Sequence, residues 1–150
     1  MRYLLDTNIF LFVTREGDEL DSNVKTILED YENSFVISSE SIREIAALVA
    51  NGKIRVKGWD TFAGIKASLD EHGIEIRYVA EAHLKTLFKI IPVRGHSDPS
   101  DLMIIAQAMT ENITLISSDT KFPLYIPQGL KFVQNYRRFT SKDKQLFYIV

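Results

Sequence analysis

The sequence predicts an α/β fold, a three-layer α/β/α sandwich with a mostly parallel central sheet. Short apolar runs lie at residues 3–5, 35–37, 74–79, 113–116 and 130–133, and segments with helical spacing of apolar residues alternate with them. Such alternation usually forms a parallel sheet with helices on both faces. The runs at 3–5, 35–37 and 113–116 each lead into a polar cluster. Parallel sheets place their functional groups at the carboxyl ends of strands in this way.

The chain is expected to form a single domain, residues 1–150. Apolar residues make up 45% of the 150 residues, which is enough for one sizeable core. The 18 Lys and Arg against 20 Asp and Glu give a formal net charge of −2. A nucleic-acid partner would therefore have to bind a local basic patch rather than a globally basic protein.

The composition also restricts the compartment and the kind of metal site. The chain has no cysteine, which excludes disulfides and thiolate ligands but leaves open a hard cation held by carboxylate oxygens. No run of apolar residues is long enough to span a membrane, and the N-terminus lacks the pattern of a signal peptide. We therefore expect a cytoplasmic protein.

Helices are expected at residues 7–13, 24–31, 42–49, 59–69, 80–88 and 102–109. The third ends at Asn51-Gly52 and the fourth at His72-Gly73. The last is apolar on almost all sides, so it should pack deeply against the sheet. In the helix at 80–88, the residues expected on the inner face are Leu84, Leu87 and Phe88.

Other segments are expected to be peripheral. Residues 53–57 alternate cations with apolar residues, which favours an extended or surface-lying linker, and a last strand near 130–133 completes the sheet. Residues 137–150 form a basic tail whose order the sequence does not define, although its apolar end at 147–150 could dock. The histidines share no metal-ligand spacing and are expected to be ordinary surface or loop residues: His72, His83 and His96.

Two acids follow the first two strands. Asp6 comes directly after the run at 3–5, either as a site residue or as the N-cap of the next helix. Glu44 lies in the expected first turn of the helix after the second strand. It could belong to the site, to a solvated helix face, or to a capping box with Ser41.

Three further acids flank the apolar helix at 102–109. Asp98 is expected to be its N-cap, with Pro99 at the first helical position, and Asp101 falls at the third position of the first turn. Both acids therefore have a structural explanation. Asp119 follows the strand at 113–116 after two serines. This arrangement repeats the pattern at the N-terminus.

Parallel strands would bring Asp6, Glu44 and Asp119 to one edge of the sheet, and Asp101 joins them if the loop before its helix allows it. Carboxylates gathered in a partly buried cleft repel one another by several kcal/mol, so a bound cation is expected. Mg²⁺ or Mn²⁺ suits oxygen ligands and phosphate substrates. A water activated by such an ion could attack a phosphodiester.

Together the motifs resemble the PIN domain, and in particular VapC-like ribonuclease toxins of type II toxin–antitoxin systems. They are LLDTN at 4–8, Glu44, DPSDLMIIAQA at 98–108 and LISSD at 115–119. The resemblance covers residues 1–136. It implies that Asp6, Glu44, Asp101 and Asp119 are the catalytic acids, with Asp6, Asp101 and Asp119 as metal ligands. The supporting positions are Thr7, Asn8, Ser117 and Asp98.

The resemblance further implies a Mg²⁺- or Mn²⁺-dependent endoribonuclease that cleaves RNA, forms a homodimer and is restrained by an antitoxin protein. The chain departs from the family pattern at two positions. Ser117 stands where the family usually has Thr, which keeps the hydroxyl, and Leu102 stands where an Arg is common, so one potential phosphate contact is missing.

Two alternatives belong to other functional classes. A non-catalytic PIN-like RNA-binding or regulatory module would be expected to lose one or more of the acids, whereas this chain retains all four. A Mg²⁺ phosphatase with an aspartyl-phosphate intermediate usually has a second Asp two residues after its nucleophile, and this position is Asn8. Both are weaker interpretations than the nuclease.

Overall fold

The computed structural model describes residues 1–15 and 18–137, which form one five-stranded parallel sheet with the order β3-β2-β1-β4-β5. The strands are β1 (Arg2–Leu5), β2 (Ser34–Ser38), β3 (Ile74–Arg77), β4 (Thr114–Ser117) and β5 (Phe132–Gln134). All five predicted strands exist, although β3 stops two residues early and β5 begins two residues late. The predicted fold class is confirmed, and β1 is the central strand.

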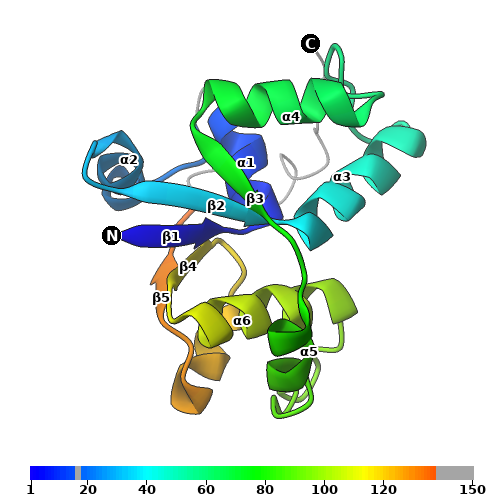
Figure 1. Cartoon of the computed structure of the whole chain (residues 1–150). Coiled ribbons are helices and arrows are strands. Elements are labelled where there is room, and N and C mark those ends of the chain that lie inside the picture. Colours follow the sequence, from blue (N-terminus) through cyan, green and yellow to red (C-terminus); the bar gives the residue numbers. More distant parts are fainter. Residues whose placement is uncertain (16–17, 138–150) are drawn as a thin grey trace.

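Helices cover both faces of the sheet (Figure 1). One layer contains α1 (Thr7–Thr14), α2 (Ser22–Glu29), α3 (Ser39–Ala50) and α4 (Phe62–Glu71). The other contains α5 (Glu81–Leu87), α6 (Pro99–Glu111) and the 3₁₀ helix η1 (Phe122–Gln128). The sequence did not predict η1. The predicted second helix ends early at Glu29, which leaves Tyr31 fully exposed outside it.

Successive residues of the central strands face opposite layers. Leu5 and Ile37 belong to the core under α1–α4, whereas Leu4 and Val36 belong to the core over α6 and η1. All four are buried, as expected for parallel strands covered on both faces. The register pairs Leu5 with both Ile37 and Ile116, so the carboxyl ends of β1, β2 and β4 are level.

The inner face of α5 differs from the prediction. Leu84 and Phe88 are 44% and 90% exposed, while His83 is buried. His83 Nδ1 accepts a hydrogen bond from Ala80 N (2.9 Å), and its Nε2 lies 2.7 Å from Glu111 Oε2. The imidazole therefore caps α5 and joins it to α6. The expectation that His83 is a surface residue was therefore wrong. Of the three apolar residues predicted on the inner face, only Leu87 packs against the core.

The segment before α4 is more buried than predicted. Ile54 and Trp59 are each 2% exposed, and the Trp59 ring stacks on Phe10 with centroids 5.6 Å apart. Thr61 is the N-cap of α4, so Trp59 precedes the helix rather than beginning it. The interpretation of residues 53–57 as surface-lying was wrong for Ile54, which anchors the linker in the core.

The predicted tail lies almost wholly outside the described residues, which end at residue 137. Within them, the Arg137 guanidinium lies 4.7 Å from the centroid of the Phe12 ring. This part of the expected tail is therefore held against α1. Among the described residues, no helix is both long and apolar enough to cross a membrane.

Candidate metal centre

Asp6 links β1 to α1 at the centre of the carboxyl edge of the sheet. Its backbone N–H donates to Ile116 O (3.0 Å), which ties it to β4. Its carboxylate accepts from Thr7 N (2.8 Å) and from Ser117 Oγ (2.6 Å). Asp6 is the N-cap of α1 and also faces the other acids, so the cap and site interpretations describe the same side chain.

Burial raises the pKa of Asp6 from 3.8 to about 7. The hydrogen bonds from Ser117 and Thr7 oppose this shift, and the negative charges of Asp101 and Glu44 add to it. A buried carboxyl whose neighbours are also acids is stabilised as an anion when a cation binds beside it.

Glu44 lies in the second turn of α3, one turn later than predicted. The helix begins at Ser39 with Ser38 as its N-cap, so a capping box between Ser41 and Glu44 does not form. Thr7 Oγ1 lies 2.9 Å from Glu44 Oε1 and 2.8 Å from Ser41 Oγ. Thr7 therefore joins the Asp6 loop to α3. Burial raises the pKa of Glu44, and the charges of Asp101 and Asp98 act in the same direction.

Asp98 and Asp101 occupy the predicted positions at the start of α6. Asp98 is the N-cap and accepts from Ser100 N (2.9 Å), while Asp101 is the third helical residue. Burial raises the pKa of Asp101, and the charges of Asp98 and Asp119 raise it further. Asp98 is exposed, whereas Asp101 faces the other acids. Arg43 reaches the same helix start and donates to Ser100 Oγ (2.7 Å).

Asp119 follows β4 and shares a hydroxyl with Asp6. Its backbone N–H donates to Ser117 Oγ (3.0 Å), and that hydroxyl donates to Asp6 Oδ2. One Asp119 carboxylate oxygen accepts from Lys121 N (2.7 Å). Ser117 thus fixes the distance between the two acids, and a threonine hydroxyl at this position could serve in the same way.

His96 is the site residue that sequence reasoning missed. It is buried, and its Nε2 lies 3.0 Å from Asp101 Oδ2. Ligand atoms of His96, Asp101 and Asp119 all lie within 4.8 Å of one another. The expectation that His96 is an ordinary loop residue was wrong. Its position depends on the loop before α6, and no spacing rule relates it to Asp101.

A comparison with protein families identifies the fold. The PIN domain profile matches residues 3–125. The chain belongs to the PIN domain family. The resemblance inferred from the motifs at Asp6, Asp101 and Asp119 is therefore confirmed at the level of the family. Curated proteins contain no match to the chain.

Solved structures share this PIN fold. One is VapBC2 from Rickettsia felis, solved bound to a DNA fragment from the VapBC2 promoter. The matching chain is 22% identical, with a TM-score of 0.63, and the match covers 90% of this chain and 99% of that one. A chain of VapBC-1 from nontypeable Haemophilus influenzae is 21% identical, with a TM-score of 0.59 and coverage of 89% and 98%. A chain of FitAcB from Neisseria gonorrhoeae is 16% identical, with a TM-score of 0.52, and the match covers 88% of this chain and 96% of that one. Similarity at these identities shows a common fold.

In this PIN domain, the four predicted acids gather at one end of the sheet. Of the predicted supporting residues, Thr7 and Ser117 are hydrogen-bonded to them, and Asp98 lies close enough for its charge to act on Glu44 and Asp101. The Asn8 side chain is exposed and has no hydrogen bond to these acids among the described residues, so its supporting role stays a prediction. The donor set consists mainly of carboxylates, and burial together with mutual repulsion raises the pKa values of Asp6, Glu44 and Asp101. A divalent cation with a preference for oxygen ligands fits this set.

Proposed function

We propose that this PIN domain is a metal-dependent endoribonuclease that hydrolyses RNA phosphodiester bonds with Mg²⁺ or Mn²⁺. The observation that carries the proposal is the convergence of Asp6, Glu44, Asp101 and Asp119, of which three have raised pKa values. Asp6 follows β1, Glu44 lies on α3, Asp101 lies on α6, and Asp119 follows β4. Such a cluster costs folding free energy unless a cation compensates it.

Asp6, Asp101 and Asp119 are the residues that would hold the ion. Ser117 orients Asp6 and the Asp119 backbone, and Thr7 holds Glu44 Oε1. Held in this way, Glu44 would orient a water or a group bound to the ion. The ion, when bound, supplies the positive charge that polarises a phosphodiester and favours deprotonation of an attacking water.

Two exposed cations flank the acids and would bind the RNA backbone. Arg43 stands next to Glu44 on α3 and reaches Ser100, and Lys121 lies two residues after Asp119 with its Nζ 2.6 Å from Gly95 O. Lys and Arg contacts to phosphates give sequence-independent binding and position the strand. With a net charge of −2, RNA binding would depend on such local cations, although Arg43 is also ion-paired with Glu40.

Cleavage of a labelled single-stranded RNA tests the nuclease proposal. The purified protein should cut the RNA with Mg²⁺ or Mn²⁺ and should stop with excess EDTA. Asp101→Asn should lower the rate by a factor of about 100 or more, because metal ligands and their charge are central to this chemistry. Asp98→Asn is the matched control at the same helix start, since it keeps the cap and should retain most activity.

Cleavage that survives complete chelation would contradict the metal mechanism. If Asp98→Asn were inactive and Asp101→Asn near normal, the exposed cap acid would be the site residue. Circular dichroism of each variant would show that the fold is intact, so a lost rate could not be attributed to unfolding.

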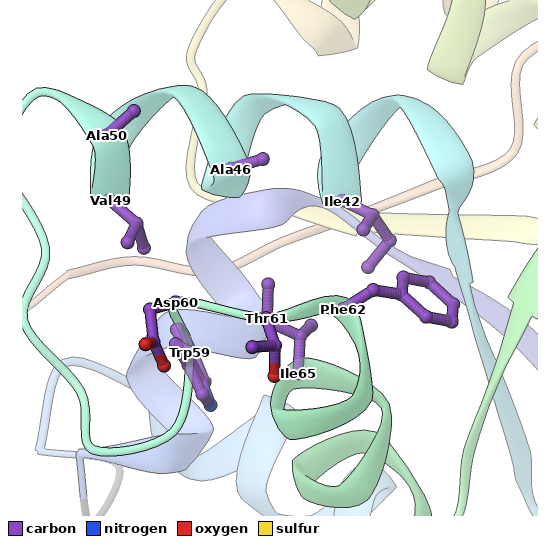
Figure 2. A pocket seen from close by; sticks show the side chains of 9 residues that line it. All are labelled: Ile42, Ala46, Val49, Ala50, Trp59, Asp60, Thr61, Phe62 and Ile65. Carbon is purple, nitrogen blue, oxygen red and sulfur yellow. The ribbon is translucent and has the colours of Figure 1, made fainter.

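We further propose that the nuclease is a toxin restrained by an antitoxin protein. The structures with a similar fold include VapBC and FitAcB assemblies. A groove of about 380 Å³ between α3 and α4 offers a place for such a partner (Figure 2). Its lining is mainly apolar and consists of Ile42, Ala46, Val49, Ala50, Trp59, Asp60, Thr61, Phe62 and Ile65. A partner helix with an apolar face would bury this surface.

Growth of a bacterial host tests the toxin proposal. Expression of the wild-type chain should arrest growth, Asp101→Asn should not, and co-expression of the small gene adjacent to the toxin gene should relieve the arrest. Ala46→Arg should still arrest growth but resist relief, because the new side chain fills the groove. Ala47→Arg on the exposed side of the same helix is the control.

Normal growth at high levels of soluble, active enzyme would contradict the toxin role and leave the nuclease proposal intact. If co-expression relieved the growth arrest caused by Ala46→Arg as completely as that caused by Ala47→Arg, the antitoxin would bind elsewhere.

A homodimer is the assembly that we propose for the chain. Exposed apolar side chains on the face opposite the groove offer a surface for it: Phe88 (90% exposed) and Ile91 (73%) beside α5, and Leu124 (54%) in η1. Gln128 joins these two segments through hydrogen bonds to Ile91 N (2.9 Å) and Ile91 O (2.7 Å).

A further inference from the structure

His96 is the centre of a chain of hydrogen bonds that ends at an acid of the candidate metal centre. Its Nε2 lies 3.0 Å from Asp101 Oδ2, and its Nδ1 lies 2.8 Å from Tyr125 Oη. The same Tyr125 oxygen accepts from Val93 N (3.0 Å). His96 and Tyr125 are both buried. The His96–Tyr125 bond is therefore shielded from solvent, while the Asp101 end of the chain lies at the partly exposed site.

The direction of these bonds follows from the hydrogens available. The phenolic oxygen of Tyr125 already accepts from the Val93 amide, and it has one hydrogen of its own to donate. We infer that this hydrogen is donated to His96 Nδ1, the ring nitrogen 2.8 Å away, because the described residues offer the hydroxyl no other acceptor. A neutral imidazole with an unprotonated Nδ1 has its hydrogen on Nε2, which then donates to Asp101.

Further hydrogen bonds hold the His96 loop against η1. Lys121 Nζ donates to Gly95 O (2.6 Å), and the Gln128 side chain bonds both backbone groups of Ile91. Because η1 follows Asp119, this contact links the loop that leads to Asp101 with the segment that contains Asp119. The position of His96 is thus set by backbone contacts of its loop with η1 as well as by the bond from its ring to Tyr125.

We propose that His96 is a positioning residue that fixes Asp101 for cation binding by donating its Nε2–H to Oδ2, with its tautomer set by the Tyr125 hydroxyl. This inference rests on the proposed metal-dependent function. The hydrogen bond orients the carboxylate and leaves Oδ1 for the cation. Groups that orient a metal-binding side chain in this way typically change metal affinity by about 10- to 100-fold when they are removed.

The alternative role for His96 is that of a direct nitrogen ligand. Its nitrogen lies within 4.8 Å of oxygens of Asp101 and Asp119, close enough to share an ion. The hydrogen-bond chain argues against this role, because an Nε2 that carries hydrogen has no lone pair for a metal. A positioning role predicts hydrogen on Nε2 and no direct ¹⁴N coupling to bound Mn²⁺. A ligand role predicts an Nε2 without hydrogen and a direct coupling.

Nitrogen–proton correlation spectra of the metal-free protein test the tautomer directly. At mildly alkaline pH, His96 should show hydrogen on Nε2, and its signals are those that disappear in His96→Gln. An Nδ1–H tautomer would overturn the proposal. This result does not depend on metal binding, so it separates the inference from the proposed function.

Mn²⁺ titration followed by electron paramagnetic resonance tests the effect on the site. His96→Phe keeps the ring volume but has no donor, and it should weaken Mn²⁺ binding by about tenfold or more. His96→Gln provides an amide donor and should stay within about threefold of the wild type. Tyr125→Phe, which removes only the hydroxyl, should fall between them.

Unchanged affinity in folded His96→Phe would overturn the positioning role. A pulsed spectrum of bound Mn²⁺ with ¹⁴N coupling that is lost in His96→Phe would overturn it in favour of a ligand. If the wild type fails to bind Mn²⁺, the metal-dependent function fails, and the positioning role fails with it even if the tautomer is as expected.

Discussion

At the scale of single residues, Asp6 shows why a cap and a catalytic acid need not exclude each other. Its Oδ1 accepts from Thr7 N at the start of α1, and its Oδ2 accepts from Ser117 across the sheet. The sequence identified Asp6 because a short apolar strand leads directly to it. It could not reveal His96 or Tyr125, because their partners are set by the path of a loop and by an unpredicted 3₁₀ helix.

The raised pKa of Asp6 predicts an unusual pH dependence of stability. The folded value of about 7 lies above 3.8, so between these values the folded state binds more protons than the unfolded state. The metal-free protein should therefore lose stability as pH rises from about 4 to about 7, by an amount on the order of 4 kcal/mol for Asp6. The raised pKa values of Glu44 and Asp101 act in the same direction.

Urea unfolding in EDTA at several pH values measures this loss. Asp6→Asn should show a flatter profile and should be more stable than the wild type near neutral pH, because it removes one member of a repelling set. If the free energy of unfolding changed with pH equally in the wild type and in Asp6→Asn, the pKa of Asp6 would not be raised as described.

At the scale of elements, the boundaries that were wrong have local physical causes. Ser38, Ser39 and Ser41 are all competent caps, so the sequence could not select the start of α3, and Glu44 was placed one turn too early. The start of α6 was predicted correctly because Asp98 followed by Pro99 is a far less ambiguous signal. For the inner face of α5 the prediction was right for Leu87 but wrong for Leu84, because His83 is buried instead.

Gly64 provides a prediction for the contact between α4 and the segment before it. A Cβ at this position would lie 1.6 Å from Gly58 O. Alanine usually stabilises a helix relative to glycine, but here Gly64→Ala should destabilise the fold by about 2 kcal/mol, because the helix must move away from the Gly58 carbonyl. Urea unfolding followed by the fluorescence of Trp59, the single tryptophan, measures the change.

Ala67→Gly at an exposed position of the same helix is the control for helix propensity. It should cost about 1 kcal/mol. A Gly64→Ala protein more stable than the wild type would show that α4 does not approach Gly58 so closely, and the shape of the α3–α4 groove would then need revision.

At the scale of the whole molecule, the parallel sheet brings together acids that lie far apart in sequence. The level ends of β1 and β4 place Asp6 beside the segment that contains Asp119, with Ser117 bridging the two. This convergence was predictable from the alternation of strands and helices. The position of Asp101 beside the other acids could not be predicted in this way, because it depends on residues 91–96 being held against η1.

The central claim is that these acids form one cation site, and anomalous X-ray scattering from crystals soaked in Mn²⁺ tests it most directly. The wild type should show an anomalous peak among the carboxylates of Asp6, Asp101 and Asp119, and Asp101→Asn should lose it or reduce it strongly. An active protein whose Mn²⁺ lies elsewhere, or whose peak is unchanged by Asp101→Asn, would contradict the account.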